Sequence, residues 1–162
     1  MNDKPLKLLC VLAHPDDESL GMGGTLARNA SEGAETYLVT ATRGERGWFG
    51  GEKDNPGPAA LGTMLEAELR CASETLGIRE VCFMDYIDGE LDQAPSDEAV
   101  AMIVSHIRRI KPDVVITFAP DGAYGHPDHI AICQFTTAAV VCAADPNYVD
   151  TSGEPHRISK LY

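Results

Sequence analysis

Basic residues are scarce in this chain of 162 residues. It has 13 Lys and Arg residues against 25 Asp and Glu residues, which gives a formal net charge of −12 at pH 7. This balance disfavours attraction to the phosphates of nucleic acid and to anionic membrane surfaces. We therefore expect no nucleic-acid partner, and a neutral or cationic small molecule suits the chain better than an anionic one.

Paired cysteines are also lacking. The chain has five cysteines, an odd number, and none of them forms a C-x-x-C pair. A disulfide framework and a thiolate metal site are both disfavoured by this pattern. Most lie in apolar segments, so we predict reduced core residues at Cys10, Cys71, Cys82, Cys133 and Cys142.

No apolar run approaches the roughly 20 residues of a membrane span. The first apolar run, residues 8–13, is too short for the apolar region of a signal peptide and continues directly into an acidic motif. We expect a cytoplasmic protein without a membrane span. The sequence leaves the oligomeric state open, and a homo-oligomer is possible.

Strand and helix signals alternate along the chain. Apolar runs predict strands at residues 6–13, 35–41, 80–84 and 114–118. Helical spacing of apolar residues predicts helices at residues 19–32, 61–76, 96–111 and 126–143. Glycine and proline make residues 43–60 a long loop, of a length that is often functional.

This alternation is typical of a parallel sheet with right-handed crossover connections. We predict an α/β fold, a Rossmann-like three-layer α/β/α domain with a mostly parallel sheet, and assign residues 1–162 to a single domain. The hydrophobic content of 44% is sufficient for one sizeable core. Ligands of such sheets bind beyond the carboxyl ends of the strands, where the strand order reverses, commonly between the first and fourth strands.

Two motifs rich in acidic residues and histidine follow the first and fourth predicted strands. They are Ala-His-Pro-Asp-Asp-Glu at residues 13–18 and Gly-His-Pro-Asp-His at residues 125–129. His14, Asp17 and His129 supply two imidazoles and one carboxylate, a ligand set that gives a catalytic zinc three protein ligands and one open position. A lone Asp or His at a helix start is usually a cap, but two such motifs at matched strand ends favour a metal site.

Three motifs give the chain a resemblance to the PIG-L/LmbE-like family of zinc-dependent N-deacetylases. The two motifs above, the second extended to Tyr124, flank Thr-Arg-Gly-Glu-Arg-Gly at residues 42–47, in the family's order. The resemblance implies a Rossmann-like fold and Zn²⁺, or another divalent metal such as Fe²⁺, held by His14, Asp17 and His129. It also implies removal of an acetyl group from the amide nitrogen of an N-acetylglucosamine-type sugar or conjugate.

The same resemblance assigns catalytic roles. It makes Asp16 the general base for a metal-activated water that attacks the amide carbonyl, a proton transfer made easier because zinc lowers the pKa of bound water to about 7. Tyr124 and His126 stabilise the oxyanion or protonate the leaving amine. Asp128 either orients and charges His126 or serves as a first-turn helix residue.

Other residues keep two interpretations each. Trp48 and Phe49 either stack on a sugar or only hold the long loop in place, while Asp88 either contacts substrate hydroxyls or, as we slightly favour, forms a turn.

Two features depart from the family. Leu65 stands where members commonly carry Arg, and family chains usually continue beyond the Lys-Leu-Tyr segment at residues 160–162, so we expect a domain that ends early.

Two alternatives to acetyl removal remain. One is an amidase of the same family that cleaves a larger N-acyl conjugate. The other is a truncated, non-catalytic Rossmann-like module that binds metal without turnover.

Overall fold

Five strands form one parallel sheet at the centre of the molecule, in the order β3-β2-β1-β4-β5. The computed structural model describes residues 4–162, and its strands are β1 (Lys7–Leu12), β2 (Glu35–Thr42), β3 (Ile78–Tyr86), β4 (Val114–Ile116) and β5 (Lys160–Leu161). All neighbouring strands are parallel. The predicted α/β fold is confirmed, and the strand order reverses between β1 and β4, as expected.

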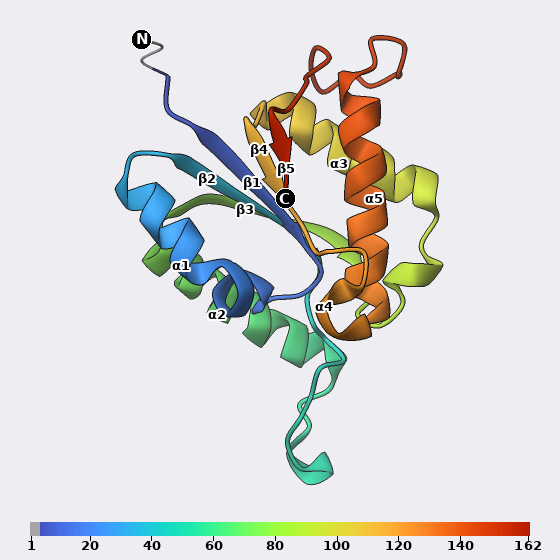
Figure 1. The fold of residues 1–162 in the computed structure, drawn as a ribbon. Coiled ribbons are helices and arrows are strands. Elements are labelled where there is room, and N and C mark those ends of the chain that lie inside the picture. The colour runs from blue at the N-terminus through green and yellow to red at the C-terminus, as the bar shows by residue number, and fades with distance from the viewer. Residues whose placement is uncertain (1–3) are drawn as a thin grey trace.

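Helices cover both faces of this sheet (Figure 1). One face carries α1 (Asp17–Ser31) and α2 (Pro58–Leu76), and the other carries α3 (Ser96–Ile110) and α5 (Pro127–Ala144), with the short α4 (Gly122–Gly125) before α5. Two 3₁₀ turns lie at Glu52–Asp54 and Leu91–Gln93. Within residues 4–162, no helix is long and apolar enough to cross a membrane.

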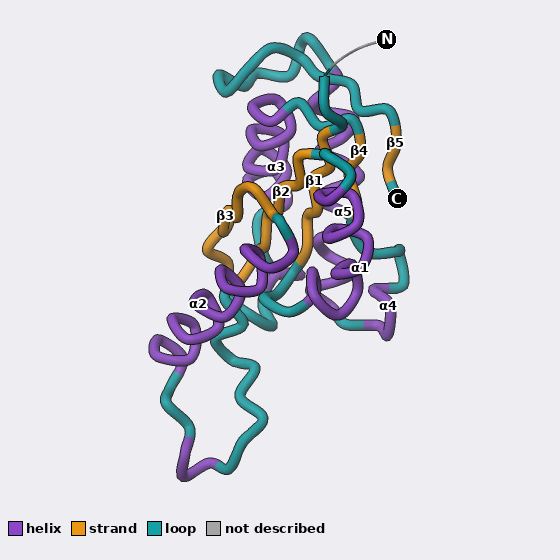
Figure 2. The backbone as a smooth tube through the Cα atoms, turned by 90° about the vertical axis from the view of Figure 1, so that its left-hand side faces the viewer, coloured by secondary structure: helices purple, strands orange, loops and turns teal. Residues whose placement is uncertain are grey.

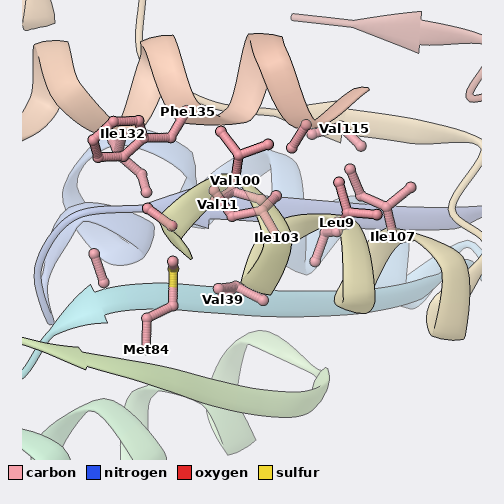
Figure 3. Packing of buried hydrophobic residues seen from close by; sticks show 14 of the residues in the cluster. Leu9, Val11, Val39, Met84, Val100, Ile103, Ile107, Val115, Ile132 and Phe135 are labelled. Atoms are coloured by element: carbon pink, nitrogen blue, oxygen red, sulfur yellow. The ribbon is translucent and has the colours of Figure 1, made fainter. Parts of the chain in front are cut away.

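Strand β1 is buried on both faces, which explains its unbroken apolar run. Side chains alternate between the faces of a strand. Leu9 and Val11 join Ile103 of α3 in the larger core cluster, shown in Figure 3. Leu8 joins Leu26 of α1 in the smaller cluster on the opposite face. The alternation therefore supplies each helical layer with its own core.

Two helix starts differ from the prediction. Helix α1 begins at Asp17 instead of Ser19, because the carbonyl oxygen of Asp16 accepts hydrogen bonds from the amides of Ser19 and Leu20 at 3.0 and 2.9 Å. Helix α2 begins at Pro58, whose fixed φ suits a first helical position. The loop between β2 and α2 is therefore slightly shorter than predicted, and it projects away from the three layers (Figure 2).

The cysteine prediction is partly wrong. Cys10 and Cys133 are buried core residues, but Cys71 is exposed. It lies on α2 beside the half-buried Ala72 and two positions from the buried Leu69, so the helical period turns its side chain away from the sheet.

Candidate metal centre and active site

Loops at the carboxyl edge of the sheet converge on His14. This residue follows β1, and Asp17 is the first residue of α1. The loop after β3 contributes Asp88, and the first turn of α5 contributes His129. His14 Nδ1 lies 3.1 Å from His129 Nε2. The expectation that the two distant motifs meet in space is therefore confirmed.

The turn between β1 and α1 has an unusual backbone. Asp16 has a φ of 122°, a conformation that residues with a side chain rarely adopt. Its amide donates to Glu18 Oε2 at 3.0 Å, and Glu18 is buried. Asp17 Oδ2 accepts from the amides of Ala13 at 3.2 Å and His14 at 2.8 Å. These bonds hold the turn closed, and strain maintained in this way is typical of functional sites.

The three predicted metal ligands lie close together. Besides the 3.1 Å between the imidazole nitrogens, Asp17 Oδ2 lies 3.7 Å from His14 Nδ1, and Asp17 Oδ1 lies 3.5 Å from His129 Nε2. Ligands about 2.0–2.1 Å from a tetrahedrally coordinated ion lie about 3.3 Å from one another. The three predicted ligands are thus brought together, with the two histidines reached by different oxygens of the Asp17 carboxylate.

The outer nitrogens of both rings have acceptors of their own. His129 Nδ1 lies 3.3 Å from the carbonyl oxygen of Gly122. His14 Nε2 lies 3.1 Å from Asp128 Oδ2 and 3.2 Å from Asp88 Oδ1. With a proton on each outer nitrogen, the inner nitrogens direct lone pairs at each other, so a proton or a cation must lie between them. A ring oriented in this way by an outer acceptor is the usual arrangement of a metal-ligating histidine.

The pKa values reflect this crowding of charge. Burial alone lowers the pKa of His14, but its hydrogen bonds with Asp128 and Asp88 outweigh that effect and raise it to about 10. Burial and the charge of His14 lower the pKa of His129 to about 4. Burial raises the pKa of Asp17 to about 6 and also raises that of Asp16. The carboxylates thus favour positive charge at the centre, and His129 stays neutral, as a ligand requires.

Asp128 has a different partner from the one that the sequence suggested. Its buried carboxylate contacts the ring of His14, and it accepts from the amides of Gly89 at 2.8 Å and Leu91 at 3.1 Å. Only the main-chain amide of Asp128 reaches His126, donating to its Nδ1 at 3.2 Å. The interpretation that the Asp128 carboxylate orients His126 is therefore wrong for this structure. Its placement in the first turn of α5 is correct.

Asp88 lies in the turn that the sequence favoured, and it also makes a contact that the sequence did not suggest. It lies in a turn after β3, but its buried carboxylate also contacts His14, and its Oδ2 accepts from the amide of Arg46 at 3.1 Å. The sequence slightly favoured the turn over a contact with substrate hydroxyls. The position of Asp88 after a strand end that opens onto the same edge was the signal for its contact with His14.

The segment at residues 42–47 braces the centre, a role that sequence reasoning did not assign. The Thr42 hydroxyl donates to the carbonyl oxygen of Ala13 at 3.0 Å. Glu45 accepts from the amides of Asp88 at 3.0 Å and Arg43 at 3.2 Å. The loop after β2 is thereby tied to the loops that follow β1 and β3. Arg43 itself pairs with Glu66 and Asp85, so it is not a free solvated side chain.

A cavity of about 220 Å³ opens beside His14 and Asp17. The metal-site residues His14 and Asp17 line it together with Pro15, Asp16, Gly44, Gly47, Phe49, Leu65, Asp88, Tyr124 and His126. His126 Nδ1 is an acceptor, which leaves Nε2 to carry the proton of the neutral ring. Tyr124 is 75% exposed; desolvation and the charges of Asp17 and Asp16 raise its pKa, so its hydroxyl keeps the proton.

Two sets of three residues that could hold a metal ion share His14 with this centre, and neither set includes Asp17. The histidines His14, His126 and His129 lie within 4.8 Å of one another, and so do the donor atoms of His14, Asp88 and Asp128. His126 already uses Nδ1 as an acceptor, and Asp128 already accepts two main-chain amides. Both are better suited to support the centre than to ligate a cation.

A family profile described as "PIG-L: GlcNAc-PI de-N-acetylase" matches residues 9–140. The chain belongs to this family. The match covers most of β1, the strands β2 to β4 and all three motifs, so the candidate metal ligands lie within the matched region.

Relatives of this PIG-L domain include a 1D-myo-inositol 2-acetamido-2-deoxy-alpha-D-glucopyranoside deacetylase of Rhodococcus erythropolis, 42% identical over 96% of this chain and 60% of the relative. Among solved structures, a conserved protein of Thermus thermophilus has a TM-score of 0.79 and 36% identity over 96% of this chain and 64% of its own. The N,N'-diacetylchitobiose deacetylase of Pyrococcus horikoshii has a TM-score of 0.83 and 26% identity over 96% of this chain and 58% of its own. The chain thus spans about 60% of the length of the curated relative.

Proposed function

We propose that this PIG-L domain is an N-deacetylase whose divalent cation, Zn²⁺, is held by His14, Asp17 and His129. The spacing of 3.1–3.7 Å among their donor atoms carries the proposal. Two imidazoles and one carboxylate suit zinc, and Fe²⁺ is the alternative that the same donors accommodate. When bound, the cation supplies Lewis-acid polarisation of the amide carbonyl and lowers the pKa of water.

The substrate class follows from the relatives. The Rhodococcus enzyme is named for a 2-acetamido-2-deoxyglucopyranoside, and the Pyrococcus enzyme is named for diacetylchitobiose. Both names describe an acetylated amino sugar. We therefore propose an N-acetylglucosamine-type sugar or conjugate as the substrate of this domain. Two linked changes make up the reaction: a water oxygen bonds to the acetyl carbon, and the bond from that carbon to nitrogen breaks, releasing acetate and the free amine.

Asp16 accepts the proton of the attacking water. It lines the cavity beside His14 and Asp17, and its position in the strained turn is fixed by the bond from its amide to Glu18. Burial raises its pKa, which brings a carboxylate closer to the operating pH of a general base.

His126 and Tyr124 are the proton donors of the cavity. Nε2 of His126 and the hydroxyl of Tyr124 each carry a proton, as described above, and both side chains line the cavity. They stabilise the oxygen that becomes negative in the transition state, and one of them protonates the leaving nitrogen. Asp128 is a positioning residue that fixes the ring of His14.

Acetate release tests this function. The purified chain is incubated with N-acetylglucosamine, its methyl glycoside and N-hexanoyl-glucosamine, with and without a chelator, alongside metal analysis of the protein. Chelator-sensitive release that added zinc restores is the expected result. Stoichiometric zinc with no release from any N-acetyl or longer N-acyl sugar supports the non-catalytic alternative, whereas release only of longer acyl groups supports the amidase alternative.

A further inference from the structure

A second cavity, of about 320 Å³, opens beside the cavity of about 220 Å³ that contains His14 and Asp17, here called the catalytic cavity. Residues of α1 and α2 line it, and these two helices pack against each other on the same face of the sheet (Figure 1). Four residues belong to the walls of both cavities: Pro15, Asp16, Phe49 and Leu65. Because Asp16 is among them, a substrate whose amide lies beside Asp16 can place a neighbouring substituent in the second cavity.

The second cavity has a largely apolar wall. Leu65, Leu69 and Ala72 follow one another at helical spacing on α2, and Leu69 is buried. At the rim, Leu20 is 84% exposed and Phe49 is 98% exposed. Covering such side chains with an apolar group is favourable because it removes apolar surface from water.

Charge further restricts what this surface accepts. Across residues 4–162, no Lys or Arg lines either cavity. The second cavity includes Glu18 and Glu68, and the catalytic cavity includes three aspartates. Glu18 is already engaged by the amide of Asp16 and the hydroxyl of Ser19. An anionic group such as a phosphate would find only like charge here.

We propose that the second cavity is a specificity subsite for an uncharged, apolar substituent of the N-acylated amino sugar. The inference rests on the proposed function, because its test by acetate or hexanoate release requires deacetylation. An alkyl chain enters the subsite either as part of the N-acyl group or as part of the group at the anomeric oxygen, and the two sources are separated by experiment.

Three compounds provide the comparison. They are methyl N-acetyl-glucosaminide, its hexyl glycoside, and the methyl glycoside of N-hexanoyl-glucosamine. We expect at least one six-carbon compound to bind about tenfold more tightly than the methyl N-acetyl compound. Even partial burial of several methylene groups gains enough free energy for a tenfold increase in affinity. The compound that gains identifies the source of the chain. N-Acetylglucosamine 1-phosphate is expected to bind more weakly than the methyl glycoside.

Binding is followed without turnover through Trp48, the only tryptophan of the chain, which stacks on Phe49 with ring centroids 6.2 Å apart. Acetate or hexanoate release is measured in parallel. A binding preference without release rejects the proposed function and supports the subsite. Release without any preference for an alkyl chain supports the function and overturns the subsite.

Two variants of α2 locate the effect. Ala72→Phe fills the second cavity without changing a residue that lines the catalytic cavity. Ala67→Phe adds the same side chain at an exposed position of the same helix that lines neither cavity. The preference for a six-carbon chain should disappear in Ala72→Phe and persist in Ala67→Phe. A preference that survives in Ala72→Phe, with both variants folded by circular dichroism, overturns the proposal.

Discussion

Replacing Asp128 by asparagine is expected to weaken metal binding about 10- to 100-fold, the usual effect of removing a hydrogen-bonding partner of a ligating histidine. The carboxylate accepts from three donors: the ring of His14 and the amides of Gly89 and Leu91. Asparagine has the same shape but only one oxygen. If that oxygen keeps His14 and Gly89, the new amide group faces the buried amide of Leu91, donor against donor. An unsatisfied buried donor costs about 1–3 kcal/mol of unfolding free energy.

The two effects are measured separately. Competition with a chromogenic chelator gives the zinc affinity, and urea unfolding of the metal-free protein gives the stability. Asp92→Asn removes the same charge from an exposed side chain, so it controls for the change in net charge. Zinc affinity within about twofold of the parent in a folded Asp128→Asn variant would refute the role of Asp128 in positioning His14.

Three further outcomes are expected. Asp16→Ala should retain zinc while the rate of acetate release falls about 10²- to 10⁴-fold, and full activity in this variant rejects Asp16 as the base. Zinc at about 1,000 times its Kd should add about 4 kcal/mol to the unfolding free energy measured with urea, and His129→Ala, lacking one ligand, should lose most of that gain; equal gains in both proteins argue against His129 as a ligand. Arg108, 2% exposed, donates to four main-chain carbonyls at the end of α5, so Arg108→Ala should cost about 2–4 kcal/mol of stability without altering zinc affinity; an unchanged urea midpoint contradicts this anchoring role.

The arrangement of strands was predictable because it depends on local patterns. Runs such as Leu8 to Ala13 are apolar without a break because β1 is covered on both sides, and alternation with helical periods requires a parallel sheet. The end of β4 was not predictable from pattern alone. The apolar run continues to Phe118, but the strand ends at Ile116, and the Phe118 ring instead stacks on His129 with centroids 3.8 Å apart.

The meeting of the two motifs was equally predictable, since carboxyl ends of neighbouring parallel strands share an edge. The partners of individual side chains were not. Asp128 is adjacent to His129 and two residues from His126, and the sequence therefore suggested a local partner, yet its carboxylate turns to His14 and to the loop after β3. That choice depends on the path of residues 86–91, which no periodicity encodes. The bracing by Glu45, which accepts from the amide of Asp88, depends on the same loop path.

The way in which the acidic residues are held explains why the centre selects a cation. Asp17 accepts main-chain amides of Ala13 and His14, Asp88 accepts the amide of Arg46, and Asp128 accepts two further amides. Main-chain amides orient a carboxylate but carry no net charge, so they do not neutralise its negative charge, although the ring of His14 offsets part of the charge of Asp88 and Asp128. A Lys or Arg in the same place would neutralise it, and within residues 4–162 neither lines the cavity. The remaining negative charge around His14 and His129 favours a divalent cation there and disfavours a substrate that brings a negative charge of its own.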